Sequence, residues 1–222
     1  MIAEPTTGEP TTGEPTTRKR ALGRWLSFSM PLLCGERAAQ IVEFAVTLPL
    51  LVVFVVGIFD FSSAFTLKQR LTNIARDAAR AAAADPVNDL LQSSTPLPQS
   101  VMDAFQTVDN GLLASNLNDC GVTASGSPSG LTWTFTASGN GCPAIGLTIT
   151  INRGYYFPPG GAGLPSVTCT AQTPNGQTTL VGTCVSIQYF YPWRFGRAAS
   201  LLGATTVLPA QIAGIAVAMN EN

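Results

Sequence analysis

The sequence contains no histidine among its 222 residues. This absence excludes Ser-His-Asp and Cys-His catalysis, and also metal sites built on imidazole. Charged residues are scarce, at 11%, and the formal net charge is −1. Domains that bind nucleic acid usually carry a basic patch or stripe, so the composition argues against a nucleic-acid partner. No motif gathers the carboxylates into one cleft, so we predict neither an enzyme nor a cofactor.

The chain is instead rich in apolar residues, and its mean hydropathy is +0.25. An uncharged apolar run extends from Phe44 to Phe59, between Glu43 and Asp60. A bilayer requires about 20 residues of helix, and the run alone is slightly shorter than that. The residues on either side extend it, so the sequence predicts a transmembrane span over about residues 41–65. Asp60 is expected to mark the outer interface.

The next residues keep a helical period but change in character. Apolar residues recur at the spacing of one helix face, and polar or basic residues fill the other positions. Asp85-Pro86 then stops the pattern. We therefore predict one long helix over residues 39–85, with one half in lipid and the other covered by a folded domain. The apolar face consists of Leu67, Leu71, Ile74, Ala78 and Ala81.

Residues 86–222 are predicted to form a β-rich domain. Apolar and β-branched runs alternate with Gly and Pro clusters, which is typical of an antiparallel sheet. A short helix is expected at Ser100–Val108, and turns at 125–130, 139–146, 158–165 and 174–176. The predicted strands are Leu131–Ala137, Leu147–Ile151, Val167–Ala171, Val181–Tyr191 and Thr205–Met219. The fold class is therefore α+β, a long transmembrane and amphipathic helix packed on an antiparallel sheet.

Four of the five cysteines lie beyond the predicted span: Cys120, Cys142, Cys169 and Cys184. Four cysteines in an exported domain predict two disulfides, and three pairings are possible. Proximity in sequence favours Cys120 with Cys142 and Cys169 with Cys184. A metal site of four thiolates is the less favoured alternative, because no C-x-x-C motif is present.

Residues 1–38 are predicted to be a disordered cytoplasmic leader. Glu4–Thr17 is an imperfect EPTTG repeat that lacks the apolar residues for a core. Five basic residues then precede the apolar run, and Cys34 is expected to be a free thiol. Ser62-Ser63-Ala64 has the small residues of a signal-peptidase site, but the helical pattern continues across it and favours retention.

Four motifs in the long helix carry a family resemblance. They are V-E-F at Val42–Phe44, L-P-L at Leu48–Leu50, G-I-F-D-F at Gly57–Phe61 and Q-R-L-x-N-x-A-R-x-A-A-R at Gln69–Arg80. In this order they resemble the TadE-like family, which consists of pilin-related, single-span proteins of bacterial tight-adherence pilus systems. The resemblance implies a pilin-like fold and a single pass through the bacterial inner membrane, with a cytoplasmic N-terminus and an extracytoplasmic C-terminal domain.

The resemblance also implies a processing site. Prepilin peptidase cuts pilin-like precursors before the apolar run, and a cut between Ala38 and Ala39 would make Glu43 the fifth mature residue. The family usually has Gly where this chain has Ala38. The Glu43 carboxylate would then pair with the new α-amino group of Ala39 in an adjacent subunit. The alternative is that Glu43 only stabilises the helix N-terminus through the macrodipole.

The function that follows is structural. The sequence predicts a minor pseudopilin or pilus-assembly component, whose partners are the inner membrane, other pilin or pilus-assembly subunits and prepilin peptidase. The alternative is a single-pass exported binding module, such as a sugar-binding adhesin, that uses the helix only as an anchor.

Overall fold

The computed structural model describes residues 36–86, 88, 97–143, 145–157, 169, 181–200, 203 and 207–221. By its internal contacts the chain divides into two units, Met1–Glu43 and Phe44–Asn222. The described part of the first unit is the beginning of helix α1. The predicted leader otherwise lies outside the described residues. All the other elements belong to the second unit.

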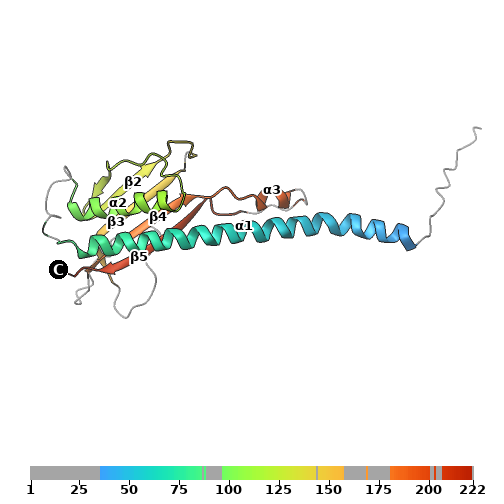
Figure 1. Cartoon of the computed structure of the whole chain (residues 1–222), viewed down its shortest axis with the longest axis horizontal. Helices are drawn as coiled ribbons and strands as arrows, with labels where there is room; N and C mark the ends of the chain where they lie inside the picture. The colour runs from blue at the N-terminus through green and yellow to red at the C-terminus, as the bar shows by residue number, and fades with distance from the viewer. Residues whose placement is uncertain are drawn as a thin grey trace, which may run out of the picture. The chain divides into compact units, whose positions relative to one another are not determined.

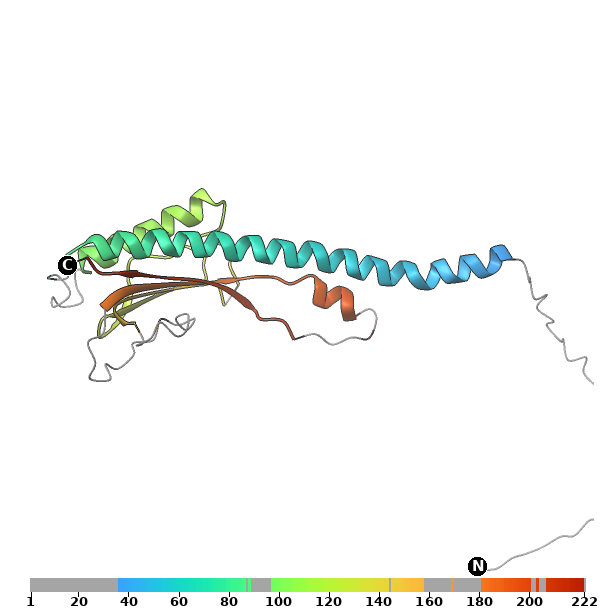
Figure 2. The ribbon, with the colours of Figure 1, turned by 90° about the horizontal axis from the view of Figure 1, so that it is seen from below.

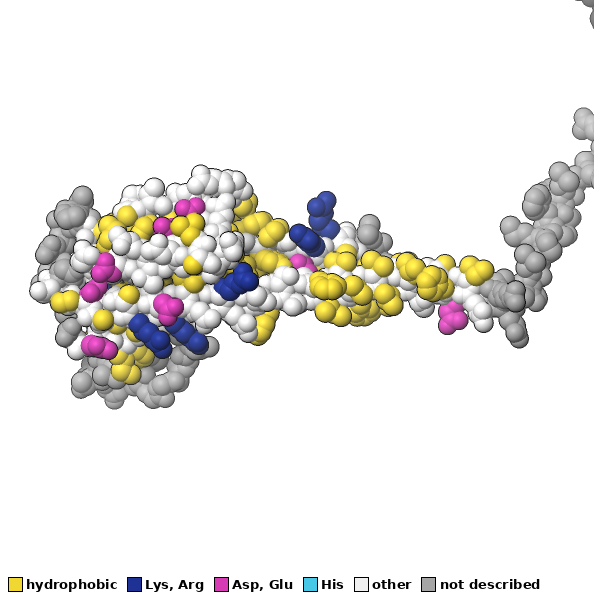
Figure 3. Space-filling view, viewed as in Figure 1, with side chains coloured by type: hydrophobic (Ala, Val, Ile, Leu, Met, Phe, Trp, Pro, Cys, Tyr) yellow, Lys and Arg dark blue, Asp and Glu magenta, His cyan; other side chains and the backbone are white. Residues whose placement is uncertain are grey.

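Helix α1 extends from Glu36 to Ala84 and has 49 residues, with Pro49 inside it. The predicted long helix is confirmed. Large apolar side chains cover the surface of its Phe44–Phe61 portion (Figure 3). In the following portion, the side chains expected on the apolar face are buried, except that Ala81 is only half-buried. The change from exposed to buried divides the helix into an exposed half and a covered half.

Five antiparallel strands form one sheet, and they neighbour each other in chain order (Figure 1). Each connection joins adjacent antiparallel strands, so the sheet is a simple meander. The strands are β1 (Ser127–Ser129), β2 (Thr132–Ala137), β3 (Leu147–Tyr156), β4 (Val181–Phe190) and β5 (Gln211–Met219). With α1 packed on it, the sheet gives the predicted α+β arrangement.

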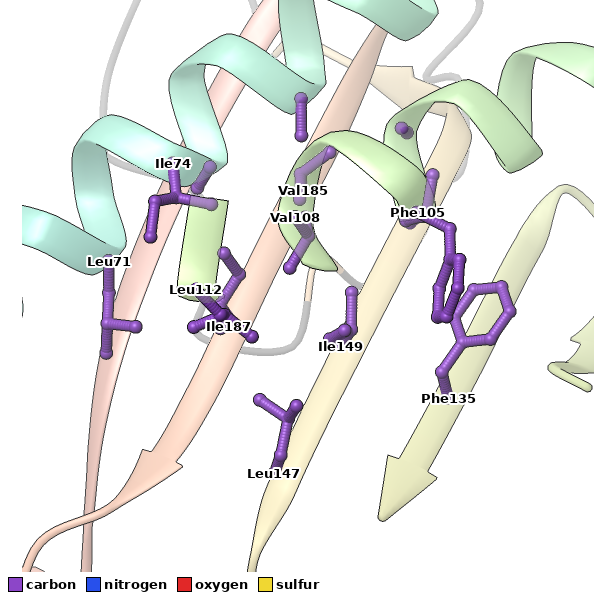
Figure 4. Close-up of a cluster of buried hydrophobic side chains, with 14 of the residues drawn as sticks. Leu71, Ile74, Phe105, Val108, Leu112, Phe135, Leu147, Ile149, Val185 and Ile187 are labelled. Carbon is purple, nitrogen blue, oxygen red and sulfur yellow. The ribbon is translucent and has the colours of Figure 1, made fainter. Parts of the chain in front are cut away.

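The core lies between this sheet and two helices. Helix α2 (Gln99–Ala114) lies with the second half of α1 on the same side of the sheet (Figure 2). Alternate residues of the strands face these helices, as the two-residue period of a strand requires. Leu71 and Ile74 of α1 meet Ile187 of β4 and Ile149 of β3 in a cluster of buried side chains (Figure 4).

Two glycines permit the closest approaches in this core. A Cβ atom on Gly214 of β5 would lie 2.4 Å from the backbone carbon of Leu71, so the strand and α1 are almost in backbone contact. A Cβ atom on Gly111 of α2 would lie 2.9 Å from a methyl group of Ile74. Larger residues at either position would push α1 away from its neighbours.

The structure also differs from the sequence predictions. Strand β1 lies in the predicted turn at 125–130, because its edge position tolerates Pro128 and pairing with β2 outweighs low strand propensity. Helix α2 is longer than Ser100–Val108. The short helix α3 (Phe195–Ser200) was not predicted, and β5 begins at Gln211 instead of Thr205. The predicted strand Val167–Ala171 lies outside the described residues, apart from Cys169.

Candidate functional site

The first half of α1 exposes its apolar side chains. Phe54 is 63% exposed, Ile58 is 68% exposed and Phe59 is 70% exposed. These fractions are far too high for the core helix of a soluble domain. Within the part of the chain that the structure describes, α1 is the single helix long and apolar enough to cross a membrane. The exposure therefore fits a single-pass membrane protein.

Hydroxyl groups in and beside this half satisfy their hydrogen bonds inside the helix. The Thr47 hydroxyl donates to the carbonyl oxygen of Phe44, and the Ser63 hydroxyl donates to that of Phe59. Such bonds remove the penalty of an unpaired polar group in hydrocarbon. The polar residues near the apolar run are thus compatible with a lipid environment.

The predicted processing and assembly residues lie in the first turns of α1. Ala38 and Ala39 follow its first residues, and Ala39 and Glu43 are exposed. Ala39 and Glu43 are four residues apart, so they share one helix face. The cleavage and the pairing that the resemblance assigns to them stay predictions.

Asp60 ends the apolar run, yet it is buried, with only 5% of its surface exposed. Its Oδ2 atom accepts hydrogen bonds from the backbone N–H groups of Arg194, at 2.9 Å, and Phe195, at 2.8 Å. The carboxylate thereby caps the N-terminus of α3, a favourable place for a negative charge. The Tyr191 hydroxyl donates to Oδ1 at 3.0 Å. Asp60 therefore holds the β4–β5 connection against α1.

Aromatic rings reinforce this attachment. A Cβ atom on Gly57 would lie 3.0 Å from the Phe195 ring, so glycine lets the ring pack against the helix. The Phe61 ring lies 5.4 Å from that of Trp193 and 5.7 Å from that of Phe195, centroid to centroid. We call Tyr191–Ser200, which includes α3, the arm. It is fixed to α1 at the end of the apolar run.

The Tyr191 hydroxyl remains a donor at neutral pH. Burial raises its pKa, and the hydrogen bond to Asp60 raises it further, because ionisation would place a second negative charge beside the carboxylate. The Trp193 indole N–H donates to the carbonyl oxygen of Pro209 at 2.6 Å. The polar groups of both rings are thus engaged.

A buried cation holds the other end of the helix. Arg153 of β3 is 1% exposed, and its guanidinium donates to the carbonyl oxygens of Ala82 and Asp85 at the end of α1. It also donates to the Thr183 hydroxyl at 2.8 Å and to Asn220 Oδ1 at 3.3 Å. A cation at a helix C-terminus is favoured by the macrodipole. Asp60 and Arg153 thus fix the covered half of α1 at both ends.

Two disulfides brace the domain. They join Cys120 to Cys142 and Cys169 to Cys184. This is the pairing favoured by sequence proximity, and it occupies all four sulfurs that the alternative metal site would need. Disulfides persist in oxidising compartments, which fits an exported domain.

Sequence reasoning missed both Asp60 and Arg153 as structural residues. The donors to Asp60 come 131 to 135 residues later in the chain, and the acceptors of Arg153 lie in α1, in β4 and just beyond β5. The only signal for Asp60 was its place in the G-I-F-D-F motif. No local pattern marks Arg153.

Residues 38–80 match the family model described as TadE-like protein. The resemblance seen in the sequence is thereby confirmed. The matched segment contains the apolar half of α1, Asp60 and most of the covered half. No curated protein and no solved structure matches the chain.

Proposed function

We propose that this protein is a membrane-anchored structural subunit of a tight-adherence pilus system, either a minor pseudopilin or a pilus-assembly component. The observation that carries the proposal is the division of α1. One half exposes large apolar residues suited to lipid, and the other is the central helix of a folded domain. The segment that matches the TadE-like family contains the exposed half and most of the covered half.

The proposed topology places the N-terminus in the cytoplasm and the sheet domain outside the inner membrane. Five basic residues precede the span, while the disulfides lie beyond it. Basic residues favour the cytoplasmic side, and disulfides favour the exported side. Both features support a cytoplasmic N-terminus and a sheet domain on the exported side.

In this proposal prepilin peptidase cuts between Ala38 and Ala39. The new α-amino group then pairs with Glu43 of a neighbouring subunit and fixes the register of two helices. A carboxylate at the lipid boundary persists if it finds such a partner. Packing between helices and contacts between sheet domains would complete the assembly with other pilus subunits.

Intact mass and N-terminal sequencing of the protein from its native membrane test the processing. We expect a mature chain that begins at Ala39. A chain that still begins at Met1 would contradict processing and leave an anchored module. A chain that begins at Phe65 would lack the anchor and contradict the whole proposal.

Glu43 is tested separately by co-purification with pilus components. We expect Glu43→Gln to reduce co-purification about tenfold or more, because the ion pair is lost at the edge of the lipid. Glu36→Gln is the matched control, since residue 36 would be removed with the leader. Equal losses in the two variants would contradict the pairing.

One observation favours the alternative, an exported binding module. A groove of about 450 Å³ lies at one end of the sheet, lined in part by Thr136, Ser138, Thr148 and Gln211. Hydroxyl and amide groups of this kind bind sugars. Retention of a glycan by the purified full chain, lost in Thr148→Val, would favour this function over assembly.

A further inference from the structure

We propose that the arm is a second membrane contact, with Arg194 and Arg197 bound to the phosphate groups of anionic phospholipids in the leaflet nearest the domain. The arm would then set the depth of α1 in the bilayer. The inference rests on the proposed membrane anchor and adds to it a site and a ligand chemistry.

The place of the arm on α1 gives the first argument. It is attached at Gly57, Asp60 and Phe61, where the exposed apolar run ends. The helix from Phe44 to Asp60 measures about 25 Å at 1.5 Å per residue. The hydrocarbon core of a bilayer is about 30 Å thick. With this run in lipid, the arm lies at the level of the headgroups.

The charges of the arm give the second argument. Arg194 and Arg197 are exposed, and within the described residues neither guanidinium has a hydrogen bond or an ion pair. The nearby carboxylate, Asp60, is already occupied by hydrogen bonds from the arm itself. The planar guanidinium presents two parallel donors that match a phosphate group. Two unoccupied guanidiniums at headgroup level therefore fit lipid phosphates.

The aromatic residues give the third argument. Tyr and Trp are enriched where membrane proteins cross from lipid to water. Tyr191 and Trp193 lie side by side in the arm, with ring centroids 4.9 Å apart, and both are partly buried. Phe61 of α1, whose ring lies against that of Trp193, remains 48% exposed. Apolar and aromatic surface thus continues from the span onto the arm.

The attachment is also rigid enough for the position of the arm to fix the depth of α1 in the bilayer. Asp60 accepts bonds from two backbone N–H groups and one hydroxyl, and the Phe195 ring packs against Gly57. Headgroups that bind the arm would consequently hold α1 at a fixed height. The span would end near Asp60 and not at residue 65, since Ala64 and Leu67 are already buried in the protein core.

Depth-dependent fluorescence quenching tests the inference on the full chain. Trp25→Phe and Trp133→Phe leave Trp193 as the single reporter, in phosphatidylcholine vesicles with or without phosphatidylglycerol. Quenching groups are attached to the lipid either at the headgroup or deep in the acyl chain. A second reporter protein adds Phe54→Trp and Trp193→Phe to Trp25→Phe and Trp133→Phe, so that its single tryptophan, at position 54, reports on the span itself.

We expect headgroup probes to quench Trp193 most strongly, and deep probes to quench the Phe54→Trp reporter most strongly. The double variant Arg194→Gln with Arg197→Gln should reduce headgroup quenching of Trp193 in anionic vesicles. Each arginine near an anionic surface raises the ratio of bound to free arm about fivefold, so each loss should lower that ratio by the same factor. Arg76→Gln with Arg80→Gln is the matched control. These residues lie at least about 24 Å farther along α1, beyond the Debye length, so quenching should not change.

Three results would overturn the inference in distinguishable ways. If deep probes quench the Phe54→Trp reporter but no probe quenches Trp193, the anchor stands and the arm does not touch the membrane. If the Arg194 and Arg197 variant is quenched like the control, the arginines do not bind phosphate. If no probe quenches the Phe54→Trp reporter, the membrane anchor itself fails, and the inference fails with it.

Discussion

Both halves of α1 have apolar side chains, but these side chains differ in size between the two halves. The exposed half is built from Phe, Leu, Ile and Val, while the covered half buries mainly alanines. The buried residues of the covered half are Ala64, Leu67, Leu71, Ile74, Ala75, Ala78, Ala79, Ala82 and Ala83. Large side chains maximise contact with lipid, whereas alanines let the backbone approach a sheet. Side-chain size therefore separates a lipid-facing helix from a core helix when hydrophobicity alone does not.

The largest expected effect comes from placing a larger side chain at Gly214, where α1 and β5 approach each other closely. A Cβ atom at residue 214 would lie 2.4 Å from the backbone carbon of Leu71 and 2.5 Å from the backbone nitrogen of Thr72. Backbone atoms cannot move aside as a side chain can. We expect Gly214→Val to lower the free energy of unfolding by about 3 kcal/mol or more, as measured by circular dichroism in detergent.

The matched control for this prediction is Ala213→Val. Residue 213 is the neighbour of Gly214 on the opposite face of β5, and it is partly exposed. We expect a change of at most about 0.5 kcal/mol, as for a surface substitution. A similar loss in both variants would mean that β5 is sensitive to any added bulk, and the close approach would not be the cause.

A pair of truncations in the two halves should separate their roles. Leu71 is fully buried, so we expect Leu71→Ala to lower the free energy of unfolding of the domain by about 3 kcal/mol. Phe54 is 63% exposed, so Phe54→Ala should change that stability by less than about 0.5 kcal/mol. Thermal unfolding in detergent measures both values. Equal destabilisation would contradict the division of the helix.

Asp60 lies at the border between the halves, and its removal should release the arm. We expect Asp60→Ala to cost about 2 kcal/mol locally, because it removes the α3 cap and leaves two partly buried N–H groups unpaired. Hydrogen exchange at Arg194 and Phe195 should become about tenfold faster or more, with little change in β2 and β3. Unchanged exchange at these two amides would contradict the proposed attachment.

The smallest expected effect concerns Asp109 on α2. Burial raises the pKa of this carboxyl, and the nearby charge of Asp119 adds to the effect. The native state therefore holds a proton that the unfolded state loses above its ordinary pKa near 3.8. Stability contributed by this proton is lost as the pH rises through the raised pKa. We expect Asp109→Asn to raise stability at pH 7 by at most about 0.5 kcal/mol, as measured by thermal unfolding at several pH values. A larger gain at pH 4 than at pH 7 would contradict the assignment.

The sequence predicted features that repeat along the chain. The spacing of Leu67, Leu71, Ile74 and Ala78 predicted which face of α1 is buried, because a helix repeats every 3.6 residues. The alternation in Val181–Tyr191 similarly indicated strand β4, which lies inside the sheet between β3 and β5. These elements follow from local patterns, so neighbouring residues carry enough information to find them.

Features that depend on contacts distant in the sequence were missed. Asp60 was expected only to mark the interface, since nothing near it shows that Arg194 and Phe195 would supply N–H donors. Arg153 lies just after the predicted strand Leu147–Ile151, and no local pattern shows that it is buried. Its partners Ala82, Thr183 and Asn220 are all distant in the sequence. β1 was predicted to be a turn because its strand character comes only from its partner β2.

The attachment of Asp60 to Tyr191 across 131 residues has a consequence for biogenesis. In the proposed topology, α1 would enter the membrane while its alanine face still lacks β4 and β5. That face would remain uncovered until translocation delivers the last strand, in which Gly214 permits the close approach to α1. Residues this far apart meet late, since closing long loops is slow. In this topology, a chaperone that shields the alanine face in this interval would raise the yield of folded subunit.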